Sequence, residues 1–95
     1  MMRREGNALI VDGPLTLQTV PELVGAAEEH IREGVQVVDF SGVTEVDSSA
    51  VALALEWQRQ AAIHERTLRL QKLPAAMQNL ARLYGVSEIL QLTTV

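Results

Sequence analysis

The residues best suited to chemistry lie in the segment VDSSA, where Asp47, Ser48 and Ser49 come directly before an apolar run. Asp and Ser are preferred at the start of a helix because their side-chain oxygens accept backbone N–H groups that the first turn leaves free. Those N–H groups also give a helix start a partial positive charge of roughly half a unit. The spacing therefore predicts an exposed, polar helix start that favours anions, with Ser48 at its tip.

Ser48 could act there without a catalytic neighbour. A phosphoryl group would add about −1.5 to −2 charges and three acceptor oxygens. The helix start would tolerate that charge, whereas an apolar or acidic partner pressed against it would not. The unmodified hydroxyl could equally dock against a partner, or could only cap the helix, which is the commonest role of such a residue. The position of Ser48 leaves these three roles open.

The pattern speaks against an enzyme. His64 follows Ser48 by sixteen residues on one expected helix, about 24 Å at a rise of 1.5 Å per residue, so the two side chains cannot pair. Asp39, Glu45 and Asp47 border one loop, and their carboxylates could hold a hard cation. The commoner role is structural: Asp39 at a strand end would accept hydrogen bonds from loop N–H groups, and Asp47 would do so at the helix start. The chain has no cysteine and no phosphate-binding glycine motif. We expect no catalysis, metal or cofactor.

Composition limits the other functions. The 95 residues predict a single domain over 1–95, and 47% apolar residues suit a folded chain. A net charge of −4 without a basic block disfavours nucleic-acid binding. The apolar stretch at 8–11 is too short for a signal peptide or a membrane span. We therefore expect a cytoplasmic protein that reaches a membrane only through a partner.

The pattern of apolar residues predicts alternating strands and helices. A β-branched run at 35–40 reads as a buried strand that turns at 39–42, and 67–70 reads as a second strand. A hairpin of 8–11 with 15–17 is expected around Asp12-Gly13-Pro14. Helices are expected from the T-x-x-E capping box of Thr19 and Glu22 to Gly34, from Ala50 onward, and from Pro74 to Gly85. This order predicts an α/β fold.

The helix that follows Ser49 has two apolar faces. Steps of 100° per residue place Val51 and Leu55 on one face and Leu53 and Trp57 nearly opposite, near Ala50. If the first face covers the sheet, Leu53 and Trp57 are exposed and suit a partner surface, because Trp is enriched among interface anchors. In the alternative rotation Ala50, Leu53 and Trp57 face the core and Val51 and Leu55 point outward. Either way, an exposed apolar face is expected.

The segment VVDFSGVTEVDSSAVAL resembles the signature of the STAS domain family, in which an apolar strand ending in Asp leads through a short loop to Asp-Ser-Ser-Gly-Leu at a helix start. The resemblance implies a STAS-like single domain with a mostly parallel mixed sheet covered by three to four helices. Asp39 and Asp47 match the family's acidic positions. Ser48 matches the serine that a partner kinase phosphorylates in anti-sigma-factor antagonists. Ala50 replaces the usual Gly and narrows the room for an approaching partner backbone.

The C-terminal segment NLARLYGVSEIL is similar to the STAS subunits of Mla phospholipid-transport systems (MlaB). This resemblance implies a non-catalytic subunit that binds the cytoplasmic ATPase of an ABC transporter, with the permease contacted indirectly. Such a system maintains the lipid asymmetry of the outer membrane. The resemblance places the residue matching Ser48 in the docking surface. Together with the apolar face of the helix, the predicted docking residues are Ser48, Ser49, Ala50, Leu53 and Trp57, supported by Asp39 and Asp47. The alternative is an anti-sigma-factor antagonist switched by phosphorylation at Ser48. Two free copies could also pair through the apolar patch.

Overall fold

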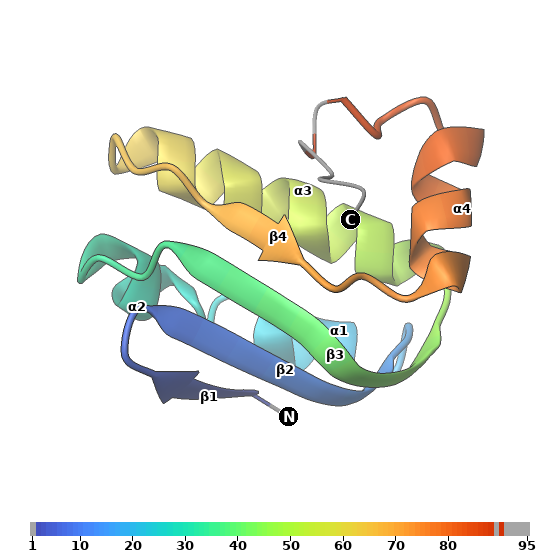
Figure 1. Ribbon diagram of the computed structural model, residues 1–95, viewed down its shortest axis with the longest axis horizontal. Helices are drawn as coiled ribbons and strands as arrows, with labels where there is room; N and C mark the ends of the chain where they lie inside the picture. Colours follow the sequence, from blue (N-terminus) through green and yellow to red (C-terminus); the bar gives the residue numbers. More distant parts are fainter. Residues whose placement is uncertain (1, 89, 91–95) are drawn as a thin grey trace.

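The computed structural model describes residues 2–88 and 90, and this part of the chain contains a four-stranded mixed sheet in the order β1-β2-β3-β4 (Figure 1). β1 (Met2–Glu5) is antiparallel to β2 (Ala8–Leu15). β3 (Val37–Val46) runs parallel to β2, and β4 (Arg69–Gln71) runs parallel to β3. The expected α/β fold with a mostly parallel sheet is confirmed.

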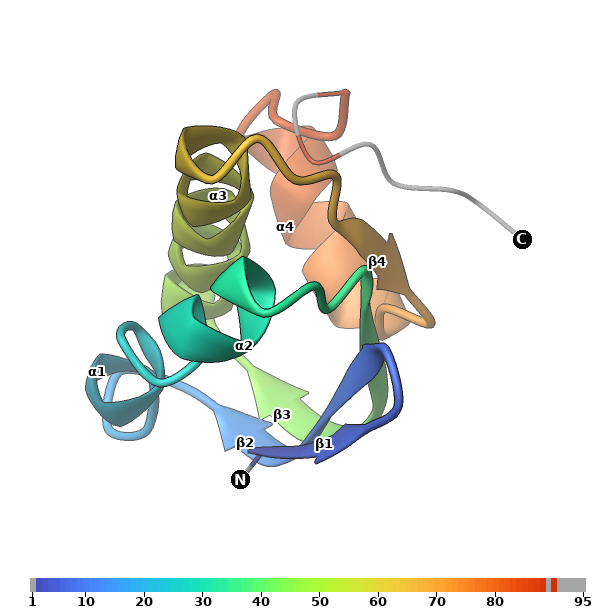
Figure 2. The same cartoon turned by 90° about the vertical axis from the view of Figure 1, so that its left-hand side faces the viewer.

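The helices pack on one side of the sheet, as Figure 2 shows for β1, β2 and β3. They are α1 (Val20–Leu23), α2 (Glu28–Arg32), α3 (Ser48–Ile63) and α4 (Ala75–Leu83). Alternate residues of the two long strands face these helices, since strand side chains point to opposite faces in turn. The fully buried strand residues that build the core are Leu9, Val11, Leu15, Val38 and Phe40.

The long helix α3 is the centre of this layer. On one side its Trp57 indole N–H donates to the carbonyl oxygen of Leu23 beside α1, at 3.3 Å. On the other side the Gln58 amide donates to the carbonyl oxygen of Leu68, ahead of β4, at 2.9 Å. α3 also contacts α2 and α4. Seven of the sixteen residues of α3 are buried, while Ala52, Arg59 and Ile63 are exposed along its remaining face.

The predicted hairpin between residues 8–11 and 15–17 is wrong. β2 continues through Asp12, Gly13 and Pro14 to Leu15 and pairs with β3, while β1 supplies its antiparallel partner. The pairing of β2 with β3 shifts register at Ile10/Asp12 and again at Gly13/Pro14, and Gly13 has a φ of +79°. Turn-forming residues here produce bulges in a continuing strand and do not reverse the chain.

The predicted end of the central strand at residues 39–42 is wrong for a related reason. β3 runs on to Val46 because the first register shift places Gly42 directly opposite Asp12. A Cβ atom built on Gly42 would lie 2.7 Å from the Asp12 Cβ, which is closer than real Cβ contacts. The two strands can approach only because residue 42 has no side chain.

The single helix expected between Thr19 and Gly34 is two short helices, α1 and α2. The Thr19 hydroxyl does not cap α1; it donates to the Pro14 carbonyl oxygen at 2.8 Å and accepts the Thr16 N–H at 2.9 Å. Gly34, with a φ of +109°, follows α2 in the left-handed conformation expected after a helix. The apolar stripe expected in this segment is Leu23, Val24, Ala27 and Ile31; Leu23, Ala27 and Ile31 are buried, and Val24 is half-buried against the core.

We predict that Gly42→Ala lowers the free energy of unfolding by about 1–3 kcal/mol, because the added methyl group forces β2 and β3 apart. Urea unfolding followed by circular dichroism measures the change. Gly25→Ala is the matched control, since a Cβ at Gly25 meets no atom within 4 Å. Equal midpoints for the two variants would contradict the assigned role of Gly42.

Candidate functional site

The carboxylate of Asp47 organises the start of α3. One oxygen, Oδ1, accepts the backbone N–H of Ser49 at 2.9 Å and the Ser49 hydroxyl. The other, Oδ2, accepts the backbone N–H of Leu17 at 2.9 Å, from the segment that follows β2. Asp47 is therefore the N-cap of α3, and Ser48 is the first helical residue. The interpretation of Ser48 as a helix cap is wrong.

These contacts keep Asp47 ionised. Hydrogen bonding from the Ser49 side chain, followed by the Leu17 N–H, holds the pKa of Asp47 below its ordinary value. The pKa of Asp39 is also lowered, first by the Ser41 side chain, with Lys72 adding to the effect. The Asp39 carboxylate accepts the Ser41 N–H at 2.7 Å and lies 3.8 Å from the Lys72 ammonium. Both acids thus serve the strand and the helix start.

Ser48 and Ser49 lie side by side in the chain but differ in their contacts. The Ser49 side chain is half-buried and donates to Asp47. The Ser48 side chain is exposed, and its hydroxyl makes no hydrogen bond within the described residues. Of the two hydroxyl groups, only that of Ser48 is presented to a partner or to a modifying enzyme.

The expected exposure of Leu53 and Trp57 is wrong. Their exposed fractions are 1% and 0%, and Ala50 is also 0% exposed. The alternative rotation of α3 is the one found, but Val51 is 3% exposed and Leu55 is half-buried, so neither apolar face is free. The physical reason is that α1 and α2 cover one face while α4 and Leu90 cover the other. The patch expected to pair two free copies is buried with them.

Leu17 is the apolar residue that lies beside Ser48 instead. It is 70% exposed, and its backbone N–H is held by Asp47, the residue next to Ser48. Ala52, one turn along α3, is exposed as well. We call Leu17, Ser48, Ser49 and Ala52 the helix-start surface. Sequence reasoning missed Leu17 by placing it in a strand; its signal was a lone Leu among the polar residues of TLQT.

The helix-start surface offers a hydroxyl group and apolar contact area, but no catalytic set. His64 lies at the C-terminal end of α3, opposite to Ser48. Among residues 2–88 and 90, no three His, Asp or Glu side chains gather as metal ligands would. This arrangement suits recognition of a protein surface. In the same described residues, no helix has the length and apolar character needed to cross a membrane.

Comparison with solved structures defines the class of fold. A chain described as "Structure of the Anti-Sigma Factor Antagonist SpoIIAA in its Unphosphorylated Form" superposes with a TM-score of 0.65 at 17% identity, over 86% of this chain and 80% of that one. A second, described as "Crystal Structure Analysis of Mglu", gives 0.57 at 16% identity, over 79% of this chain but only 20% of that one. The superpositions establish a shared fold, the STAS fold.

The family follows from the sequence match. The family model described as "Mlab, STAS domain" matches residues 1–93, so the chain belongs to that family. No curated protein matches the chain. Members of the STAS domain family act through contacts with other proteins, and the helix-start surface offers a hydroxyl group and apolar area suited to such a contact.

We predict that Asp47→Asn lowers Tm by about 2–5 °C at pH 7 and by almost nothing at pH 2. Because the folded-state pKa of Asp47 lies below its ordinary value of 3.8, its ionised form stabilises the fold above that pH. This contribution is lost as the pH falls through the folded-state pKa. Thermal unfolding between pH 7 and pH 2 tests it, with Glu22→Gln as a control for loss of an exposed carboxylate. A Tm difference independent of pH would refute it.

Proposed function

We propose that this chain is a non-catalytic STAS subunit that binds, stabilises and regulates the cytoplasmic ATPase of an ABC-type phospholipid transporter of the Mla kind. The observation that carries the proposal is the exposed hydroxyl of Ser48 at the start of α3, which makes no hydrogen bond to the part of the chain that the structure describes, in a chain whose family is described as "Mlab, STAS domain". The subunit would act in the cytoplasm and lie at the inner membrane only through its complex. Such a system would maintain the lipid asymmetry of the outer membrane.

The chemistry of the helix-start surface supports a protein partner. Leu17 supplies an exposed apolar anchor, and Ser48 a hydroxyl that can donate to or accept from the partner. The nearby charge of Asp47 is taken up by three hydrogen bonds within the subunit, so a partner need not compensate it. A stable contact centred here would bury on the order of 1,200–2,000 Å² in total and would extend beyond these residues.

We predict that Ser48→Arg reduces co-purification with the ATPase subunit at least about tenfold, because a long cation would replace a small hydroxyl at the centre of the contact. Co-expression with a tagged ATPase subunit and quantification of the bound chain measures this loss. Ala62→Arg is the matched control, since Ala62 is exposed on the same helix but near its other end. Circular dichroism establishes that both variants are folded.

A second pair of variants tests the apolar part of the same surface. Leu17→Ala should weaken the complex about fivefold or more, whereas Leu83→Ala should leave it unchanged. The two leucines are similarly exposed, at 70% and 76%, but Leu83 lies at the end of α4. Normal yields with Ser48→Arg and Leu17→Ala together would overturn the proposal that the ATPase docks here.

The alternative function is an anti-sigma-factor antagonist switched by phosphorylation at Ser48. Two observations favour keeping it: the likeness to the structure described as an unphosphorylated anti-sigma factor antagonist, and the exposure of the Ser48 hydroxyl. A phosphoryl group would add about −1.5 to −2 charges at the positive end of α3. The domain would remain folded, and a partner docked at the helix-start surface would be repelled.

Phosphopeptide mass spectrometry on the native protein separates the two functions. The switch predicts a phosphorylated Ser48 under some growth condition, with binding of the anti-sigma factor retained by Ser48→Ala and lost by Ser48→Asp. The transporter function requires no modification. Unmodified Ser48 under every condition, together with normal ATPase binding, would count against the switch.

A further inference from the structure

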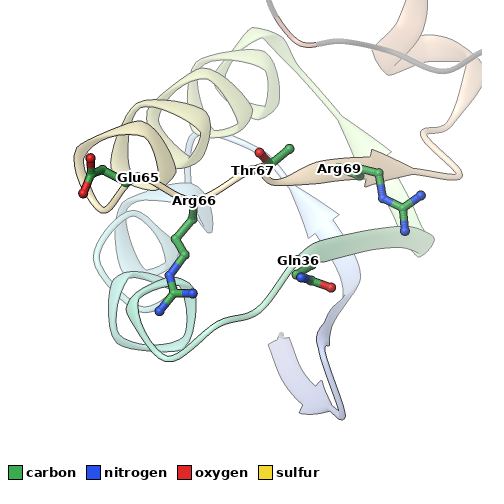
Figure 3. A pocket seen from close by; sticks show the side chains of 5 residues that line it. All are labelled: Gln36, Glu65, Arg66, Thr67 and Arg69. Carbon is green, nitrogen blue, oxygen red and sulfur yellow. The ribbon is translucent and has the colours of Figure 1, made fainter.

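A polar cleft of about 400 Å³ opens at the end of α3 remote from Ser48 (Figure 3). It is lined by Gln36, Glu65, Arg66, Thr67 and Arg69, from the segments that lead into β3 and β4. Backbone hydrogen bonds hold these segments in place. The Arg69 N–H donates to the Gln36 carbonyl oxygen at 2.9 Å, and the Arg66 N–H donates to the carbonyl oxygen of Ala61 at 2.8 Å.

The two arginines of this cleft lack the carboxylate partner that most basic side chains of the molecule have. Within residues 2–88 and 90, ion pairs join five of the eight basic side chains, Arg3, Arg4, Arg32, Arg59 and Lys72, to carboxylates; Arg66, Arg69 and Arg82 have none. The acidic side chains of nearby α2 have other partners: Glu28 lies 3.6 Å from His64 Nε2, Glu29 pairs with Arg32, and Glu33, just after the helix, pairs with Arg4. Two guanidinium groups without carboxylate partners thus border one cleft, on opposite sides of Gln36 in Figure 3, in a chain of net charge −4.

The remaining groups of the lining are arranged to donate hydrogen bonds. The Gln36 Oε1 accepts the Asn7 amide at 3.0 Å, which leaves the Gln36 amide N–H groups to donate. The Arg66 guanidinium gives one N–H to the Arg32 carbonyl oxygen at 3.0 Å and keeps its others. Figure 3 shows the one acid of the lining, Glu65, directed away from Gln36 and Arg69. Two cations and several free donors call for a ligand with acceptor oxygens only.

We propose that this cleft binds a phosphate group, from either a phospholipid headgroup or a soluble phosphate compound. The planar guanidinium fork matches the oxygens of phosphate in a bidentate manner, and the Gln36 amide and the Thr67 hydroxyl add further donors. Because the lining is open to solvent, binding is weak and sensitive to salt, with a Kd on the order of 1–10 mM at low ionic strength.

The test is a titration of the full ¹⁵N-labelled chain with sodium phosphate, against sodium chloride at equal ionic strength. Phosphate is expected to give saturable shifts of the backbone N–H signals of residues 65–69 and of the Arg66 and Arg69 side-chain N–H signals. The double variant Arg66→Gln/Arg69→Gln should lose at least about fivefold in affinity. Arg82→Gln is the matched control, because Arg82 donates only to Asn79, on α4. Shifts that chloride reproduces, or that persist in the double variant, would overturn the proposal.

A second arm distinguishes the two sources of phosphate. The unmodified chain, the double variant and Arg82→Gln are each sedimented with vesicles made of phosphatidylglycerol and phosphatidylcholine in equimolar mixture. The fraction of chain captured by the vesicles is compared. Capture that only the double variant loses assigns the headgroup, whereas a response to inorganic phosphate without capture assigns a soluble compound. The result is independent of the proposed ATPase contact, because Ser48 and the cleft lie at opposite ends of α3, about 24 Å apart along the helix.

Discussion

The hydrogen bonds of the Asp47 carboxylate fix the start of α3 against the end of β2, and the exposure of the side chains around it depends on them. They join the backbone N–H of Leu17 to the first turn of α3 across thirty residues of sequence. The Asp47 N–H also donates to the Leu15 carbonyl oxygen at 3.2 Å, so the end of β2 is tied to the same point. Because a helix turns 100° per residue, a start displaced by one position would direct different side chains to solvent. The exposure of Ser48 and its closeness to Leu17 both follow from this carboxylate.

The packing of α3 leaves its two ends as places where a ligand or partner can reach it. The apolar faces of its middle are covered by α1, α2 and α4, with Trp57 fully buried and its indole N–H bonded to the Leu23 carbonyl oxygen. Replacing such a Trp by Ala would lower the free energy of unfolding by about 3–5 kcal/mol. The apolar side chains in the middle of the helix therefore stabilise the fold. Its two ends remain available, with the hydroxyl of Ser48 at one and the arginine-lined cleft at the other. One rigid helix thus separates two chemically different surfaces.

The sequence alone predicted the features that depend on local chemistry. The α/β order, the polar helix start at Asp47 and the glycines that follow α2 and α4 at residues 34 and 85 all have local signals. It failed where the outcome depends on distant residues. The close approach of Gly42 to Asp12 has no signal in either segment taken alone, so the sequence predicts that both strands end too early. Likewise, the apolar residues of α3 do not indicate how many other helices cover them. For this reason the sequence predicts an exposed Leu53, which is buried, and gives no role to Leu17, which is exposed.

The edge strand β1 protects the sheet against pairing with a strand of another molecule. It is only four residues long, and its exposed Arg3 pairs with Glu5 and with Asp12 of β2. Short, charged edges disfavour the addition of a strand from another molecule, because pairing would strip water from these ions. The sheet should therefore not grow into fibres by the addition of strands at β1.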